Sequence, residues 1–250
     1  MTLALKLFLT PCLIAAATLV GRQWGAGVSG WLIGFPLTSG PVSLILASQY
    51  GKEFAARAAI GTLGGQASVC VFCLIYSWSA QKWTWPVCAG LAVLAFLASI
   101  IVWNSFTLSL LPTFFILILM IAVFAQLIPR RPAPKTAVSL PRWDLPARMI
   151  IATLFVIGLT NFAMRLGPQL SGLLAPFPIF ALVLAVFAHH QQGADAAIRL
   201  LRGNVIGSLA FAFFFLVVGG FLTNLDIPLT YLIATLAAIL VNGISLRLVR

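Results

Sequence analysis

The sequence predicts an all-α integral membrane protein of about nine transmembrane helices, built as two inverted four-helix repeats joined by a linker helix. Three observations lead to this fold class: the composition, a series of long apolar runs, and a match of the chain with itself. Hydrophobic residues make up 62% of the chain and charged residues only 8%. Soluble domains contain roughly 25% charged residues, so these segments belong in lipid.

Apolar runs of membrane-crossing length recur along the chain. A helix needs about 20 apolar residues to cross a hydrocarbon core of ~30 Å. We expect nine spans, near residues 3–20, 31–50, 54–77, 85–103, 107–128, 147–164, 170–189, 194–218 and 227–247. The first run has some features of a signal peptide, but its counterpart inside the chain argues for a retained helix.

The chain matches itself without gaps when Gly25 is placed on Gly167 and the register is kept, as a duplication does. The clearest further pairs are Phe35-Pro36 with Phe177-Pro178, Gly51 with Gly193, Arg57 with Arg199, Gly61 with Gly203, Gly65 with Gly207 and Pro86 with Pro228. The match predicts three parts. They are repeat A over residues 1–106, a linker helix with a basic loop over 107–145, and repeat B over 146–250.

The single linker helix reverses the direction in which the second repeat enters the membrane. The basic residues expected on one side are Arg22, Lys82, Arg130, Arg131, Lys135, Arg142, Arg148, Arg199, Arg202, Arg247 and Arg250, against Lys6, Lys52, Arg57 and Arg165 on the other. The positive-inside rule then predicts that the N-terminus lies outside and the C-terminus in the cytoplasm. Anionic lipids are the expected partners of these basic residues, and no nucleic-acid-binding pattern accompanies them.

A helix-breaking phrase occurs in both repeats, as SGWLIGFPLTSGP at 29–41 and SGLLAPFP at 171–178. Ser29 is expected to cap a helix. Pro36 and Pro178 are expected to kink the second and seventh spans, since proline removes a helical hydrogen bond. A kink that serves packing and a break that binds a substrate both remain open. The hydroxyls of Thr38, Ser39 and Ser43 follow only the first break.

Two further motifs recur in the same register. Glu53 and Asp195 each precede an arginine by four residues, Arg57 and Arg199. These are either ion pairs at helix starts or charges that attract anions at opposite entrances.

Gly61-x-x-x-Gly65 and Gly203-x-x-x-Gly207 predict close helix packing near a pseudo-two-fold axis, with the third and eighth spans packed on each other or on their repeat partners. Gln66 and Ser208 fall at equivalent mid-membrane positions. They serve either an interhelical hydrogen bond or a substrate.

The stretch SGLLAPFPIFALVLAVFAHHQQGADAAIRLLRG, residues 171–203, resembles the signature of the GlpM-like family of small bacterial inner-membrane proteins. The first repeat matches more loosely, through SGWLIGFP and QYGKEFAAR, and the linker span is not covered. The resemblance implies a fused, inverted pair of four-span units located in the bacterial inner membrane. It also implies a link to exopolysaccharide (alginate) production, without a defined reaction.

These observations favour a transporter-like protein that moves a small substrate, anionic or envelope-related, along the repeat interface. An ion channel or passive pore is the alternative, as is a non-transporting scaffold of envelope polysaccharide assembly. A homodimer is possible. We expect no enzyme, metal or cofactor, because the chain has four acidic residues and the Cys70-x-x-Cys73 pair lies in an apolar run.

Overall fold

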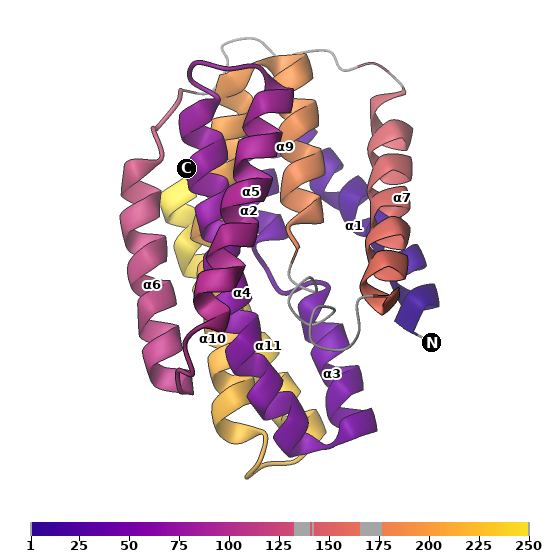
Figure 1. Ribbon diagram of the computed structural model, residues 1–250, viewed down its shortest axis with the longest axis vertical. Helices are drawn as coiled ribbons and strands as arrows, with labels where there is room; N and C mark the ends of the chain where they lie inside the picture. The colour runs from indigo at the N-terminus through magenta and orange to yellow at the C-terminus, as the bar shows by residue number, and fades with distance from the viewer. Residues whose placement is uncertain (1, 133–140, 142, 166–176, 250) are drawn as a thin grey trace.

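The computed structural model describes residues 2–132, 141, 143–165 and 177–249, which form ten α-helices (Figure 1). The helices are α1 (Thr2–Trp24), α2 (Ala26–Ile33), α3 (Ser39–Tyr50), α4 (Lys52–Ser79), α5 (Trp85–Asn104), α6 (Leu110–Leu127), α7 (Asp144–Arg165), α9 (Ile179–Gln192), α10 (Ala194–Phe221) and α11 (Ile227–Val249). The all-α prediction is confirmed for the described residues. Five of the described helices, α4, α5, α6, α10 and α11, are long and apolar enough to cross a membrane.

The centre of the bundle is an antiparallel pair, α4 and α10, of 28 residues each. The start of α4 lies beside the end of α10, where Lys52 Nζ donates to the Leu225 carbonyl at 2.9 Å. In Figure 1 the α4–α5 connection is at the top and the α10–α11 connection at the bottom. These two helices are the most buried of the five apolar ones, so the other elements are arranged around them.

Both central helices begin after a glycine in the left-handed region of backbone space. Gly51 and Gly193 each have a φ of 88°. A side chain at this φ would be strained, whereas glycine adopts it readily. Glycine therefore lets the chain turn sharply from α3 into α4 and from α9 into α10.

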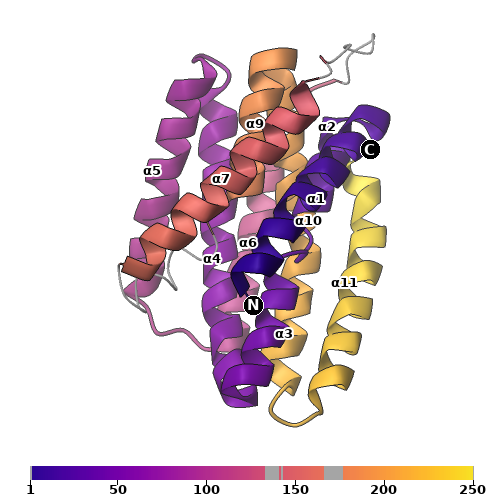
Figure 2. The same ribbon diagram turned by 90° about the vertical axis from the view of Figure 1, so that its right-hand side faces the viewer.

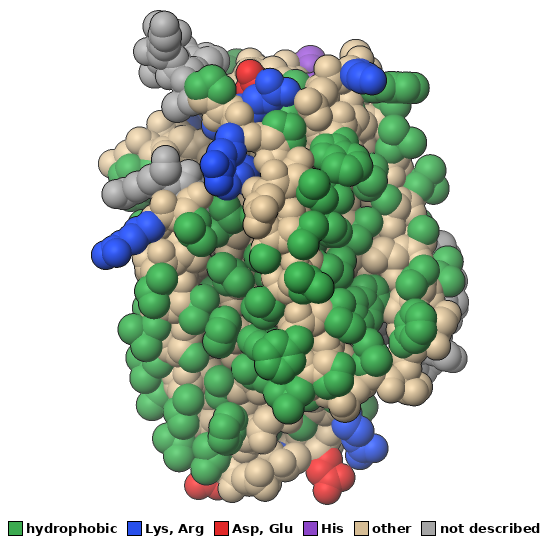
Figure 3. Space-filling view, turned by 90° about the vertical axis from the view of Figure 1, so that its left-hand side faces the viewer, with side chains coloured by type: hydrophobic (Ala, Val, Ile, Leu, Met, Phe, Trp, Pro, Cys, Tyr) green, Lys and Arg blue, Asp and Glu red, His purple; other side chains and the backbone are tan. Residues whose placement is uncertain are grey.

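The apolar outer surface of the bundle comes mainly from α5, α6 and α11. Large exposed apolar side chains on these helices include Leu94, Ile101, Leu111, Phe115, Leu119, Leu232, Leu236, Leu240 and Ile244. Figure 3 shows a broad apolar surface with Lys and Arg gathered toward its upper end. A continuous apolar face of this kind marks contact with a membrane or a partner, because monomeric soluble proteins rarely expose one.

The helices α1 and α7 pack together on another side of the bundle, where Figure 2 shows both lying obliquely across the central helices. The prediction that Ser29 caps a helix is wrong. Ser29 lies inside α2, and its hydroxyl donates to the Ala17 carbonyl of α1 at 2.7 Å. The cap position belongs to Gly25, with φ 93°, because the helix starts earlier than the apolar run suggested.

The helix α2 touches α10 backbone to backbone through glycines. A Cβ on Gly34 would come within 2.6 Å of the Gly207 carbonyl carbon, and one on Gly203 would overlap the Gly27 carbonyl. The Gly203-x-x-x-Gly207 motif thus packs against α2, while α10 also packs against α4, as expected for the third and eighth spans. Small residues at this spacing allow such an approach because nothing projects between the backbones.

Candidate functional site at the helix breaks

The first helix-breaking phrase divides the expected second span into two helices. Instead of one kinked helix over 31–50, the structure has α2 ending at Ile33 and α3 beginning at Ser39. Pro36 lies buried in the interruption. Proline has no N–H and its ring clashes with the preceding turn, so the hydrogen-bond ladder cannot run through it. The interruption leaves backbone polar groups inside the bundle that need other partners.

The two breaks share one local backbone geometry. The Leu37 N–H donates to the Phe35 carbonyl at 2.7 Å, and the Ile179 N–H donates to the Phe177 carbonyl at 2.8 Å. Pro178 has φ −79° and ψ 56°, the dihedrals of an inverse γ-turn. Each Phe-Pro phrase therefore closes a three-residue turn ahead of the following helix. The start of the second phrase, residues 171–176, lies outside the described residues.

A small cavity lies where the two breaks meet. It is lined by Leu13, Ile33, Phe35, Leu37, Thr38 and Phe180. Phe35 and Thr38 come from the first break and Phe180 directly follows the second. The volume of about 20 Å³ corresponds to room for one water-sized species, since a single water needs roughly 10–15 Å³ on this measure.

Of the three hydroxyl residues predicted near the first break, only Thr38 lines this cavity. The Ser43 hydroxyl is buried and hydrogen-bonds the Tyr231 hydroxyl of α11 at 2.7 Å. Ser39 begins α3 and is partly buried. The second break has Phe180 in place of a hydroxyl, so the polar character of the site is one-sided, as the sequence suggested.

The predicted mid-membrane polar pair meets directly between the two central helices. Gln66 Nε2 donates to Ser208 Oγ at 2.7 Å, and both side chains are buried. Ser208 Oγ in turn donates to the Asn204 carbonyl at 2.8 Å, and Asn204 Nδ2 contacts Cys73 Sγ at 3.4 Å. The side-chain amide of Gln66 on α4 therefore donates to a hydroxyl on α10. Of the two roles expected for this pair, an interhelical hydrogen bond or a substrate contact, the structure contains the hydrogen bond. The contact between Cys73 and Asn204 was not predicted from the sequence.

The two predicted entrance pairs differ in the structure. Arg57 Nη2 lies 3.4 Å from Glu53 Oε2, and both side chains are exposed. Asp195 instead pairs with Arg131, with 3.3 Å between Oδ1 and Nε. Arg199 donates to the Pro132 carbonyl at 2.6 Å. The segment after α6 has therefore taken the place of the expected ion pair between Asp195 and Arg199 at the start of α10.

A buried charge cluster that was not predicted from the sequence lies at the Asp195 end of the bundle. Asp144 Oδ1 accepts from Arg148 Nε at 2.7 Å, and its Oδ2 accepts from Arg22 Nη2 at 3.0 Å. The Asp144 side chain is fully buried and that of Arg148 is 4% exposed. Arg148 also donates to Gln191 at 3.3 Å, so the cluster ties α1, α7 and α9 together. One signal was present, because Asp144-x-x-x-Arg148 has the acid-to-arginine spacing of the entrance motifs.

The environment of Asp144 favours its ionised form. Burial alone would raise the pKa of this carboxyl. The hydrogen bonds from Arg148 and Arg22 outweigh burial, so the pKa lies below its ordinary value of 3.8. The carboxylate is therefore charged throughout the physiological range and holds two guanidinium groups in place.

No protein-family model, curated protein or solved structure matches the chain. Support for a function therefore comes from the geometry of the chain itself. Among the described residues, that geometry is an all-helical bundle with several membrane-length apolar helices and two Phe-Pro turns whose neighbouring residues line one cavity.

Proposed function

We propose that the protein is a transporter-like membrane protein in which two inverted four-helix repeats, residues 1–106 and 146–250, are joined by α6. The observation that carries this proposal is the meeting of the two Phe-Pro breaks at one cavity. Paired discontinuous helices in inverted repeats form the solute sites of many secondary transporters, because unwound backbone there can bind a solute. Thr38 is the polar side chain expected to contact it.

The repeat is supported by helix bounds that correspond in the register of the internal match. The α4 bounds of 52 and 79 become those of α10, 194 and 221, and both helices follow a positive-φ glycine. Gln66 and Ser208, which hydrogen-bond each other, are equivalent positions in the same register. Equivalent residues meet where a two-fold axis passes between repeats, and α4 and α10 run antiparallel as inversion requires. We extend the proposal to two GlpM-like units on the sequence resemblance alone.

The cavity volume bears on what such a protein moves. Space for about one water at the breaks admits a small inorganic ion or water, whereas a larger solute requires the breaks to open. This favours a channel for a small ion as the second candidate function. Saturation of flux at rising solute concentration distinguishes a carrier from a channel, whose conductance rises without saturation.

A filled cavity is expected to block solute movement. We expect Phe180→Trp to reduce flux at least tenfold in proteoliposomes loaded with a panel of small ions and envelope-related anions, because the larger ring occupies the space between the breaks. Phe115→Trp is the matched control, since Phe115 lies on the outer face of α6 with 63% of its surface exposed. Equal flux in Phe180→Trp and the wild type, or no flux of any panel member in the wild type, would contradict the proposed function.

The proposed topology puts the arginine-rich end of the bundle in the cytoplasm. Arg202 near the start of α10 donates to the carbonyls of Ala125 in α6 and Leu248 in α11. The start of α10 and the ends of α6 and α11 therefore lie at the same end of the bundle. Reporter fusions in the 129–148 loop and at the C-terminus are expected to report cytoplasm, and one in the 219–226 connection the periplasm. Opposite locations for the loop and the C-terminus would refute the inverted arrangement.

A further inference from the structure

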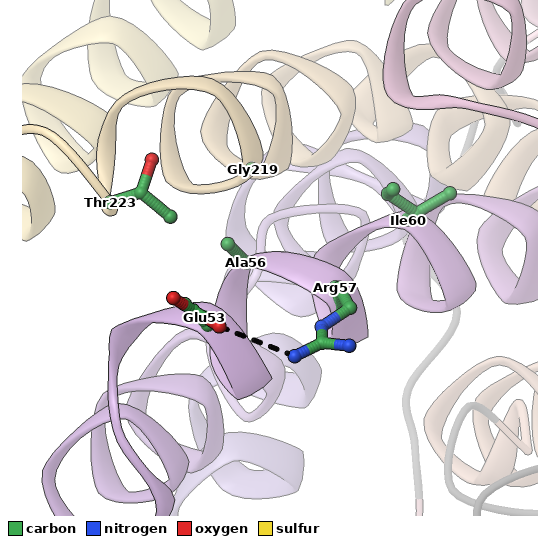
Figure 4. Close-up of a pocket in the computed structure, with 6 residues that line it drawn as sticks. All are labelled: Glu53, Ala56, Arg57, Ile60, Gly219 and Thr223. Atoms are coloured by element: carbon green, nitrogen blue, oxygen red, sulfur yellow. Dashed lines mark hydrogen bonds and ion pairs between the residues drawn. The ribbon is translucent and has the colours of Figure 1, made fainter.

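An open groove of about 210 Å³ lies between α4 and α10, at the end of the bundle opposite Arg131 and Pro132. Figure 4 shows Arg57 on α4 directed toward Glu53, with Thr223, which follows α10, across from α4 and its hydroxyl directed away from Glu53. The remaining lining residues are Ala56, Ile60 and Gly219. The groove thus combines a carboxylate, a guanidinium and a hydroxyl above an apolar lining.

The other end of the same helix pair has corresponding positions, and there the chain fills the space itself. In the register that relates the two repeats, Glu53 corresponds to Asp195, and Thr223 corresponds to Gln81. Arg131 contacts both of these residues: its Nε forms an ion pair with Asp195 Oδ1 at 3.3 Å, and its Nη2 donates a hydrogen bond to Gln81 Oε1 at 3.1 Å. A guanidinium therefore occupies the corresponding groove between an acid and a neutral acceptor.

A second contact in the filled groove involves Pro132, the residue that follows Arg131. Arg57 corresponds to Arg199, and Arg199 donates to the carbonyl of Pro132 at 2.6 Å. The occupant is thus a guanidinium followed, one residue on, by a carbonyl oxygen. The open groove retains each partner for these two groups: an acid and a hydroxyl for the guanidinium, and an arginine for the oxygen.

We propose that the open groove binds a guanidinium compound that also carries a carbonyl or carboxylate oxygen, as free arginine and arginyl peptides do. The Glu53 carboxylate and the Thr223 hydroxyl accept hydrogen bonds from the guanidinium. Arg57 turns from Glu53 to donate to the ligand oxygen. Charge-assisted pairs of this kind are stronger than neutral ones and select the planar guanidinium geometry. The binding site is independent of solute transport and is tested without a flux measurement.

The test uses the full-length protein in lipid nanodiscs and calorimetric titration at low ionic strength, because salt screens exposed charges. The first probe is N-acetyl-arginyl-proline amide, which reproduces Arg131 and Pro132, and its matched control contains citrulline in place of arginine. We expect saturable binding of the arginyl probe at one site per chain and at least fivefold weaker binding of the citrulline probe. Titration with L-arginine then distinguishes the two kinds of ligand. Tighter binding of L-arginine indicates that the site binds the free amino acid, and tighter binding of the arginyl probe indicates that it binds a peptide.

Two variants locate the binding to this groove. Glu53→Gln is expected to weaken binding of the arginyl probe about two- to fivefold, a range set by the modest strength of exposed ion pairs. The Glu53 side chain is 81% exposed, so the fold tolerates this change. Asp226→Asn is the control, because it removes a carboxylate that is 90% exposed at the same end but outside the lining.

Arg131→Gln is expected to free Asp195 and Gln81 for the probe's guanidinium, with the probe's oxygen displacing the Pro132 carbonyl from Arg199, and to raise the stoichiometry of the arginyl probe from one site to two. A single site in this variant would contradict the correspondence on which the proposal rests. Equal affinity for the arginyl and citrulline probes, unchanged affinity in Glu53→Gln, or no saturable binding at tens of millimolar probe would each overturn the proposal.

Discussion

Gly203→Ala is expected to destabilise the protein by about 2 kcal/mol or more, within the upper range for overpacked cores. The added Cβ would overlap the Gly27 carbonyl and lie 3.0 Å from the Trp31 backbone nitrogen. Both obstacles are backbone atoms, so α2 must move away from α10 as a unit. Thermal unfolding in detergent, followed by size-exclusion of the heated samples, is expected to show a midpoint about 4–8 °C lower.

Gly61→Ala is the matched control because Gly61 is the first glycine of the corresponding motif in α4. A Cβ built on Gly61 meets no atom of the described residues within 4 Å. Alanine also has the higher helix propensity, so the control is expected to be neutral or slightly stabilising. A midpoint for Gly203→Ala equal to that of Gly61→Ala would show that the α2–α10 contact contributes little to stability.

Asp144→Asn is expected to cause the largest loss of stability, about 3–5 kcal/mol, because it removes one partner of a buried ion pair. Two guanidinium groups, Arg148 at 4% side-chain exposure and Arg22 at 33%, would then lose the carboxylate that they share. The loss is expected in the same thermal assay and as exposure of α7 to proteolysis near the linker. Asp226→Asn, an exposed acid that is 90% accessible, serves as the control and is expected to change the midpoint by less than a degree or two.

The pH dependence of stability follows from the same carboxylate. Its pKa is lower in the folded protein than the ordinary value of 3.8, so the folded state binds fewer protons than the unfolded state. The stabilisation is present above the unfolded pKa and is lost as pH falls through the folded value. We expect a loss of stability below pH 3.8 that Asp144→Asn abolishes. A wild-type acid transition identical to that of the variant would contradict this assignment.

Local features were predictable where they depend on one segment of chain. Pro36 interrupts a helix because proline cannot donate a backbone hydrogen bond, and Pro178 directly precedes the start of α9. Gly51 and Gly193 allow turns that other residues would strain, and the Glu53–Arg57 pair follows from helical spacing. Each of these depends on residues within one or two turns, so periodicity and residue type were enough.

Contacts between distant segments were beyond such reasoning. Nothing near Ser29 in sequence indicates that its hydroxyl reaches the Ala17 carbonyl, because that depends on where α2 begins. Arg131 replaced Arg199 as the partner of Asp195 because the linker folds back over the start of α10. The Asp144 cluster draws on three helices, and only their packing brings Arg22 and Gln191 to one carboxylate.

The sequence by itself determined an all-helical chain with membrane-length apolar segments, a helix break at Pro36 and a pattern that recurs in the second half of the chain. These follow from hydropathy, from the chemistry of proline and glycine, and from direct comparison of residues. Only the tertiary structure decided that the breaks meet at a cavity of one water's size, and that one groove holds Arg131 while the corresponding groove is open. The reason is that cavities and ion pairs depend on how helices far apart in the chain approach one another, which no local pattern specifies.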